Sequence, residues 1–265
     1  MGILVRSQAC RAFLLAFSML SLAPAPDLAA GALISPGTME LMRKSAEPFG
    51  LFTSRISGGG LRDKWLGVER KLDDERVQLA ICDGDRARCV SRAALQFLAI
   101  VDGARAREGR ARLGEINRAI NLAIKPMSDM AQYGQDDVWS SPLDTFTTGA
   151  GDCEDYAIAK FVALRMAGVR PDDLRIVVVR DTVRGEDHAV AMARLEDRWL
   201  TLDNRRMAMV EDSDLRNLRP LFVIDDQGVM RYDDALALAG SAASPPAAAV
   251  VADPDNQAGP RPSSN

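Results

Sequence analysis

Two periodicities of hydrophobic and polar positions divide this chain. From Leu61 to Ile124 apolar residues recur three and four positions apart, which predicts helices. Pro126 is expected to end the last of these helices, because proline lacks the amide donor that a helix interior needs. A further helix is predicted from Cys153 to about Ala167, with Gly168 as its stop.

Strand patterns follow this helix. Residues Leu174 to Val179 form a continuous apolar run, whereas His188 to Leu195 alternates between apolar and polar positions. Trp199 to Asp203 is expected to close a hairpin with the alternating strand. A weaker hairpin is predicted from Leu221 to Tyr232, with its turn at residues 225–228. Helices followed by antiparallel strands predict an α+β fold, with the helix that begins at Cys153 packed on the sheet.

The first 32 residues have a different character. Arg6 and Arg11 precede an apolar run, residues 12–23, that is too short to span a bilayer comfortably. Small residues follow, with A-x-A cleavage candidates that end at Ala25 and Ala32. We interpret residues 1–32 as a secretory signal peptide and expect a periplasmic protein that does not span the membrane after cleavage. An uncleaved membrane anchor is the alternative.

The remaining chain divides into three parts. Residues 33–60 contain Pro36, Pro48 and three consecutive glycines, and we expect an extended, loosely ordered segment. Residues 61–238 are predicted to form the functional domain, within which residues 127–150 are expected to be a long irregular connection. Residues 239–265 are rich in alanine, proline, serine and asparagine, which is typical of a disordered tail.

Composition excludes one class of partner. Hydrophobic residues make up 47% of the chain, enough for a packed core, and the formal net charge is −4. The isoelectric point is about 5.2 and no basic block is present. Nucleic acid is therefore an unfavourable partner.

The cysteines fit an exported protein. Cys10 lies in the predicted signal peptide. Cys82 and Cys89 flank a short polar loop and are interpreted as a local disulfide, with two free thiols in a helical hairpin as the alternative. Their spacing is not that of a zinc knuckle. Cys153 is then an unpaired thiol, which requires a functional reason in an oxidising compartment.

That reason is suggested by the single histidine of the chain. Cys153 is predicted at a helix N-terminus, His188 at the start of one strand and Asp203 at the end of the next. Adjacent antiparallel strands place such residues side by side. Cysteine, histidine and aspartate in this arrangement are a thiol nucleophile, its base and the group that orients the base. A histidine unrelated to a buried cysteine is the alternative.

Three acidic residues surround the cysteine: Asp152, Glu154 and Asp155. The helix N-terminus is expected to lower the pKa of the Cys153 thiol, whereas the carboxylates act to raise it. The acids have two interpretations, as caps of the helix or as ligands of Ca²⁺, which would neutralise their charge. In the second case chelation is expected to lower both the activity and the melting temperature.

The stretch GAGDCEDYAIAKFVALRMAGV, with EDHAV around His188 and LDN around Asp203, resembles the bacterial transglutaminase-like cysteine proteinases, and within them the LapG-type periplasmic proteases. The resemblance extends over roughly residues 64–232. It implies a papain-like core with Cys153 as nucleophile, His188 as base and Asp203 as orienting residue. It also implies Ca²⁺ at Asp152 and Glu154, with Asp155 as a third ligand.

The resemblance further implies a substrate and a regulator. Members of the family cleave the N-terminal region of very large surface adhesins at a paired-alanine site, which disperses biofilm. An inner-membrane receptor for cyclic di-GMP holds the protease inactive when the nucleotide is abundant. Both partners are expectations from the resemblance alone.

Other functions and residue roles stay open at this point. The same triad performs acyl transfer to an amine in transglutaminases, and a non-catalytic binding module is a further alternative. The amide of Cys153 is a candidate oxyanion donor. Trp139 either shapes the cleft through its indole or packs in the core, and Asn204 either supports the turn at Asp203 or only caps it.

Overall fold

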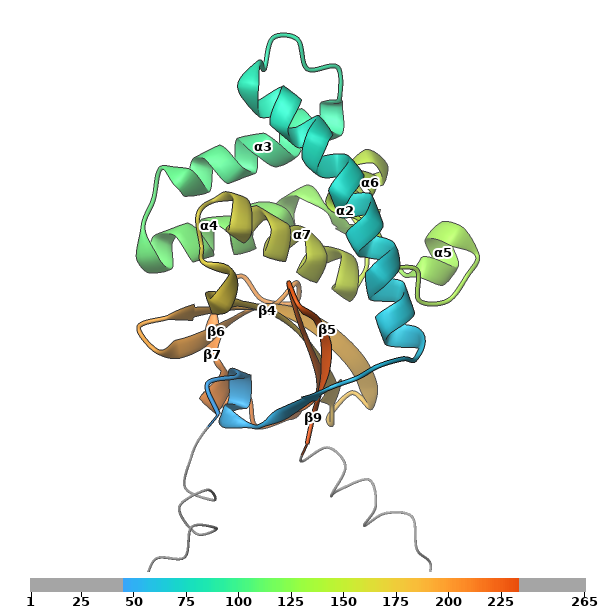
Figure 1. The fold of residues 1–265 in the computed structure, drawn as a ribbon, viewed down its shortest axis with the longest axis vertical. Helices are drawn as coiled ribbons and strands as arrows, with labels where there is room; N and C mark the ends of the chain where they lie inside the picture. The colour runs from blue at the N-terminus through green and yellow to red at the C-terminus, as the bar shows by residue number, and fades with distance from the viewer. Residues whose placement is uncertain (1–44, 234–265) are drawn as a thin grey trace, which may run out of the picture. The chain divides into compact units, whose positions relative to one another are not determined.

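The computed structural model describes residues 45–233, in which helices precede most of the sheet (Figure 1). The helices are α2 (Gly60–Gly84), α3 (Arg92–Arg105), α4 (Gly109–Ala123), α5 (Asp129–Tyr133), α6 (Pro142–Thr148) and α7 (Cys153–Met166). The predicted helical region and the helix at Cys153 are therefore confirmed. The predicted signal peptide, Cys10 and the predicted tail lie outside the described residues.

The main sheet is antiparallel, with seven strands in the order β1-β9-β8-β4-β5-β6-β7. Its strands are β1 (Thr53–Arg55), β4 (Leu174–Asp181), β5 (Glu186–Leu195), β6 (Arg198–Leu202), β7 (Val210–Glu211), β8 (Leu218–Asp225) and β9 (Gly228–Tyr232). Both predicted hairpins are present, as β5–β6 and β8–β9. The predicted α+β fold is confirmed.

Helix α7 packs on one face of this sheet, mainly against β5 and β4 (Figure 1). The residues of β5 that face the helix are all alanines, namely Ala189, Ala191 and Ala193, and each is buried. Alanine side chains let a helix backbone approach a strand closely. The close packing buries most of α7, from Glu154 to Leu164.

The opposite face of the sheet holds a second, smaller core. Val190 and Met192 of β5 contribute to it, between the alanines, because successive side chains of a strand point to opposite faces. Phe49 and Leu51, from the segment before β1, pack against this core. Strands β4 and β5 are thus buried on both sides, which explains the continuous apolar run of β4.

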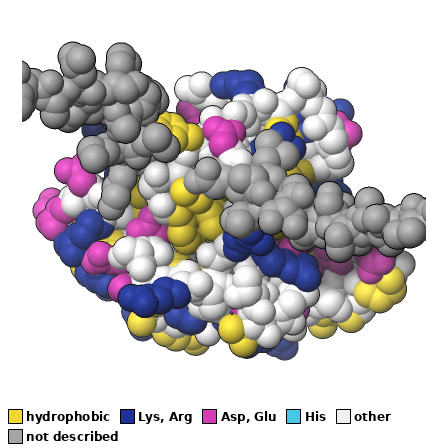
Figure 2. Space-filling model, turned by 90° about the horizontal axis from the view of Figure 1, so that it is seen from below, with side chains coloured by type: hydrophobic (Ala, Val, Ile, Leu, Met, Phe, Trp, Pro, Cys, Tyr) yellow, Lys and Arg dark blue, Asp and Glu magenta, His cyan; other side chains and the backbone are white. Residues whose placement is uncertain are grey.

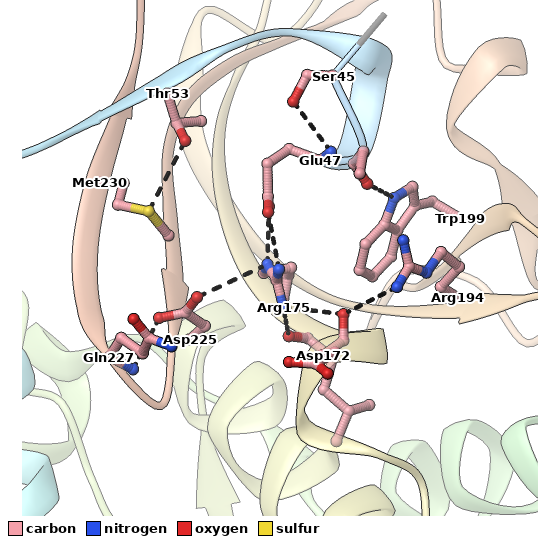
Figure 3. A network of polar contacts seen from close by, with 12 residues as sticks. Ser45, Glu47, Thr53, Asp172, Arg175, Arg194, Trp199, Asp225, Gln227 and Met230 are labelled. Atoms are coloured by element: carbon pink, nitrogen blue, oxygen red, sulfur yellow. Dashed lines mark hydrogen bonds and ion pairs between the residues drawn. The ribbon is translucent and has the colours of Figure 1, made fainter.

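The segment around Glu47 is fixed to the sheet by a polar network (Figure 3). Both carboxylate oxygens of Glu47 accept hydrogen bonds from Arg175, each at 2.7 Å, and the indole of Trp199 donates to the Ala46 carbonyl. Strand β1 pairs with β9 at the sheet edge. Residues 45–55 are therefore an ordered part of the domain, and the expectation of loose order was wrong for them.

The connection from residue 127 to 150 also differs from the prediction. It contains the helices α5 and α6, which end at Gly134 and Gly149 in the left-handed conformation, with φ of 65° and 69°. Pro142 starts α6, where its fixed φ suits the first helical turn. Both helices are too short to produce a clear apolar period, and this is why the sequence pattern missed them.

Two short strands join this region to the site. Strand β2 (Lys125–Pro126) pairs in parallel with β3 (Ala150–Gly151), which leads directly into α7.

A disulfide joins Cys82 to Cys89 across the turn between α2 and α3, as predicted. Among the described residues, no helix is both long and apolar enough to cross a membrane.

Candidate active site and metal centre

Cys153 is the first residue of α7. The preceding residue, Asp152, is extended, and its amide donates to Oδ2 of Asp155 at 3.3 Å, which fixes the start of the helix. The thiol of Cys153 donates to Oε2 of Glu154 at 3.1 Å. Cys153 is the one free cysteine of the described residues and is partly exposed.

His188 and Asp203 form a buried pair. Nε2 of His188 lies 2.9 Å from Oδ1 of Asp203, and the two residues are 1% and 7% exposed. The β5–β6 register produces this contact, since Ala191 faces Leu202 and Asp203 follows directly. Oδ1 of Asp203 also accepts from the amide of Arg205 at 3.0 Å, which orients the carboxylate.

The hydrogen bond to Asp203 decides which imidazole nitrogen is the base. When Nε2–H donates to the carboxylate, Nδ1 carries the free lone pair of neutral imidazole. Nδ1 of His188 is buried and has no hydrogen-bond partner among the described residues. The amide of Ala189, the next residue of β5, favours the thiolate of Cys153. The structure thus places His188 and Asp203 in contact, and the thiol of Cys153 beside the amide of the residue that follows His188.

The Cys153 thiol itself is more basic than predicted. Burial raises its pKa, and the charge of Glu154 raises it further, whereas the Ala189 amide acts in the opposite direction. The expectation that the helix N-terminus lowers the pKa of this thiol was therefore wrong. Desolvation and the neighbouring carboxylates outweigh the helix dipole in the absence of a cation.

Glu154 and Asp152 form a pair of carboxyl groups beside the thiol. Burial raises the pKa of Glu154 to about 9, and the hydrogen bond and charge of Asp152 act in the same direction. Side-chain oxygens of these two residues and Cys153 Sγ lie within 4.8 Å of one another. At neutral pH the Glu154 carboxyl therefore retains a proton.

Asp152 also belongs to a second group of acidic residues. Carboxylate oxygens of Asp129, Asp152 and Asp155 lie within 4.8 Å of one another. Asp129 is 2% exposed, in the first turn of α5, and its Oδ2 accepts from the amide of Val138. Burial raises the pKa of Asp155 to about 7, although one of its oxygens accepts from the amide of Ser140 at 2.9 Å.

The donor set fits a hard cation. Calcium prefers oxygen ligands at 2.3–2.6 Å, so two ligands of one ion lie up to about 5 Å apart. Oδ1 of Asp129 and Oδ1 of Asp152 are both buried without a hydrogen-bond partner among the described residues. Buried carboxylate oxygens rarely remain unpaired, and a cation between them would satisfy both.

The structure therefore changes the predicted ligand set. Asp152, Glu154 and Asp155 do not form one group; Asp152 belongs to two groups, one with Glu154 and one with Asp129 and Asp155. Asp129 was missed, because it lies in a connection that showed no pattern and no motif. Ligation by each residue remains a prediction.

Gly151 is required by this arrangement. A β-carbon at Gly151 would lie 2.5 Å from Oδ2 of Asp155 and 2.8 Å from its Cβ. Both distances are shorter than real carbon contacts. The glycine of the GDCED motif therefore leaves the space in which Asp155 holds the start of α7.

Two further candidates have structural contacts. The Trp139 indole donates to Oδ1 of Asp137 at 2.9 Å, and its ring packs against the main core. This supports the packing interpretation of Trp139 rather than that of an oxyanion donor. Asn204 follows Asp203, and its Oδ1 is buried without a partner among the described residues.

The catalytic pair borders a small cavity. It has a volume of about 170 Å³, and its lining includes His188, Asp203 and Arg205. Arg205 pairs with Glu186 at 2.7 Å. The face drawn in Figure 2 carries side chains of both charges.

Comparison with known proteins identifies a family and finds solved structures that are similar to this chain. The family model described as bacterial transglutaminase-like cysteine proteinase matches residues 78–216, which include Cys153, His188 and Asp203. The chain is similar to Legionella pneumophila LapG at 24% identity and a TM-score of 0.48, over 57% of this chain and 85% of that one. A calcium-bound structure of Legionella pneumophila LapG is similar at 25% identity and a TM-score of 0.48, over 54% and 79%.

No match is found among curated protein sequences. The family model matches more than half of the chain and includes the whole triad. The chain, which carries a thiol at a helix start and a buried histidine–aspartate pair, belongs to the bacterial transglutaminase-like cysteine proteinases and is a cysteine peptidase.

Proposed function

We propose that this peptidase is calcium-dependent and works in the periplasm, where it cleaves the N-terminal region of a large surface adhesin. The observation that carries the calcium proposal is the pair of unpaired, buried oxygens of Asp129 and Asp152 beside the nucleophile. The solved structures of Legionella pneumophila LapG include a calcium-bound and an EGTA-treated form. This supports the same cation here.

Asp129, Asp152 and Asp155 would hold the ion, with Glu154 beside it in the group that shares Asp152. When bound, calcium would supply positive charge that offsets the carboxylates around the thiol. The side chain of Glu154 would then be free of its proton and of its hydrogen bond from Cys153. Both changes favour the thiolate, whose pKa burial and Glu154 otherwise raise.

The triad residues perform peptide hydrolysis in two stages. Nδ1 of His188 accepts the proton of the Cys153 thiol, and the sulfur attacks the scissile carbonyl carbon. The imidazolium gives this proton to the leaving amine, which leaves a thioester on Cys153. Water, deprotonated by His188, then hydrolyses the thioester and regenerates the thiol. Asp203 keeps the imidazole oriented and stabilises its charged form throughout.

The substrate, the regulator and the compartment are proposed from the family resemblance. The GDCED motif and the segments around His188 and Asp203 resemble proteases that cleave adhesins at a paired-alanine site. The basic and apolar pattern of residues 1–32 supports export. We further propose that a membrane receptor for cyclic di-GMP binds and inhibits the enzyme.

Incubation with an N-terminal adhesin fragment tests this function. We expect one cleavage at the paired alanines in calcium, none in EGTA, and none with Cys153→Ala in either condition. An amine donor in the mixture separates hydrolysis from acyl transfer, because the transferred product is heavier by the mass of the amine less water. Equal cleavage with and without EGTA would refute the calcium dependence, and no cleavage by the calcium-loaded enzyme would refute the adhesin substrate.

The raised pKa values predict how the metal-free protein responds to pH. Glu154 and Asp155 have pKa values of about 9 and 7 in the folded state, above their ordinary 4.5 and 3.8. The folded state thus binds more protons than the unfolded state between these limits, so stability falls as pH rises from about 4 to 9. We expect the melting temperature in EGTA to fall by about 5 °C or more over this range. Calcium should abolish most of the fall, and a flat profile in EGTA would contradict the prediction.

A further inference from the structure

Lys160 is a buried lysine close to the catalytic residues, and it is not itself a member of the catalytic triad. It lies within α7, two turns after Cys153, and is 0% exposed. Its neighbours in sequence, Ala159 and Phe161, are buried and apolar. Lysine is rarely buried completely unless it is paired, because its ammonium loses its hydration.

The ammonium of Lys160 is directed to the end of β6. Nζ donates to the carbonyl of Leu202 at 3.1 Å, and Leu202 is followed by Asp203. Among the described residues, Asp203 is the one charged group that acts appreciably on Lys160, and the ring of Tyr156 lies 5.7 Å from Nζ. Both Lys160 and His188 thus act on the Asp203 carboxylate, Lys160 through its charge and His188 through a contact of 2.9 Å.

We propose that Lys160 is a positioning residue of the catalytic pair: it holds the end of β6 through Leu202 and keeps the Asp203 carboxylate ionised toward His188. This inference concerns the cysteine peptidase chemistry alone. It depends neither on calcium nor on the adhesin.

The charges of the three groups support this role. Burial acts to raise the pKa of Asp203, but the hydrogen bond and charge of His188 outweigh it, with Lys160 in support, so that the pKa is lowered. Burial lowers the pKa of Lys160 to about 7, against the effect of Asp203. Below this pH the lysine is charged, and its charge opposes a second positive charge on the imidazole.

Because the chain has one histidine, its titration can be followed directly. Protein labelled with ¹³C and ¹⁵N in histidine, without a polyhistidine tag, gives one imidazole signal, whose pH midpoint is compared in the native protein, Lys160→Met and Lys160→Gln. Methionine removes both the charge and the hydrogen bond in a similar volume, and glutamine keeps a donor for Leu202. Lys71→Met is the control, an exposed lysine that pairs with Asp144.

We expect the midpoint of the His188 signal to rise by about half a pH unit or more in both Lys160 variants and to stay unchanged in Lys71→Met. If Lys160 had only a structural role, its replacement would alter the melting temperature and leave the midpoint of the His188 signal unchanged. An unchanged midpoint in both folded variants would overturn the proposal. A rise in Lys160→Met that Lys160→Gln cancels would also overturn it, because the hydrogen bond alone would then suffice. No substrate is needed, so this result is independent of the cleavage assay.

Discussion

Replacement of Asp203 by alanine is expected to lower kcat/KM by about 10⁴, as loss of the orienting carboxylate does in other triads. The physical reason is the 2.9 Å contact from Oδ1 to Nε2 of His188, which leaves Nδ1 as the base. Without this acceptor the imidazole is free to rotate and to take the other tautomer, and the imidazolium loses its counter-charge. Cleavage of the adhesin fragment at several concentrations measures the effect.

Asparagine at position 203 is expected to cost less than alanine. The same oxygen, Oδ1, accepts from the Arg205 amide and from His188. An asparagine carbonyl in that place would keep both hydrogen bonds, so orientation would persist while the charge is lost. Asp225→Ala is the matched control, since Asp225 is 8% exposed and also ends a strand. Native activity of Asp203→Ala, or an equal loss in Asp225→Ala, would contradict the assigned role.

Asp129→Asn is expected to weaken calcium binding by more than about tenfold, the least that loss of even an outer partner of a metal costs. Asp129 contributes one of the two unpaired oxygens of the acidic cluster. In EGTA the variant is expected to melt at or above the native temperature, because burial and the charges of Asp152 and Asp137 raise the pKa of this carboxyl and make its ionised form costly. Calcium titrations by calorimetry and melting curves with and without calcium measure both effects.

Asp144→Asn provides the control for Asp129→Asn. Asp144 is an exposed aspartate in the first turn of another short helix, where it pairs with Lys71. Its removal should leave the calcium response unchanged. A calcium-induced rise in melting temperature that survives intact in Asp129→Asn would place the ion elsewhere. In that case Glu154 would become the principal ligand to test.

The contact between His188 and Asp203 was predictable from the sequence because its geometry follows from regular elements. A helix start, two paired strands and a single histidine leave few arrangements, and the β5–β6 register realises one of them. The disulfide was predictable for a similar reason, since a short polar loop separates its cysteines. Local patterns are sufficient when the partners lie on neighbouring elements.

Contacts that depend on irregular chain were not predictable. Asp129 reaches the cluster through the short helix α5, whose position depends on tertiary packing rather than on any period. The thiol pKa was predicted in the wrong direction because burial depth cannot be read from a motif. Lys160 did leave a signal, as one polar residue in an apolar helical run, but its partner at the end of β6 became evident only in three dimensions.

The alanine row of β5 has a consequence for how this enzyme tolerates change. Ala189, Ala191 and Ala193 set the gap between α7 and β5, the helix that begins with the nucleophile and the strand that carries the base. A single added methyl group at Ala191 would therefore act as a spacer that moves α7, and with it the Cys153 thiol, away from the strand that carries His188. Substitution in this enzyme is thus restricted also at residues that take no part in the reaction.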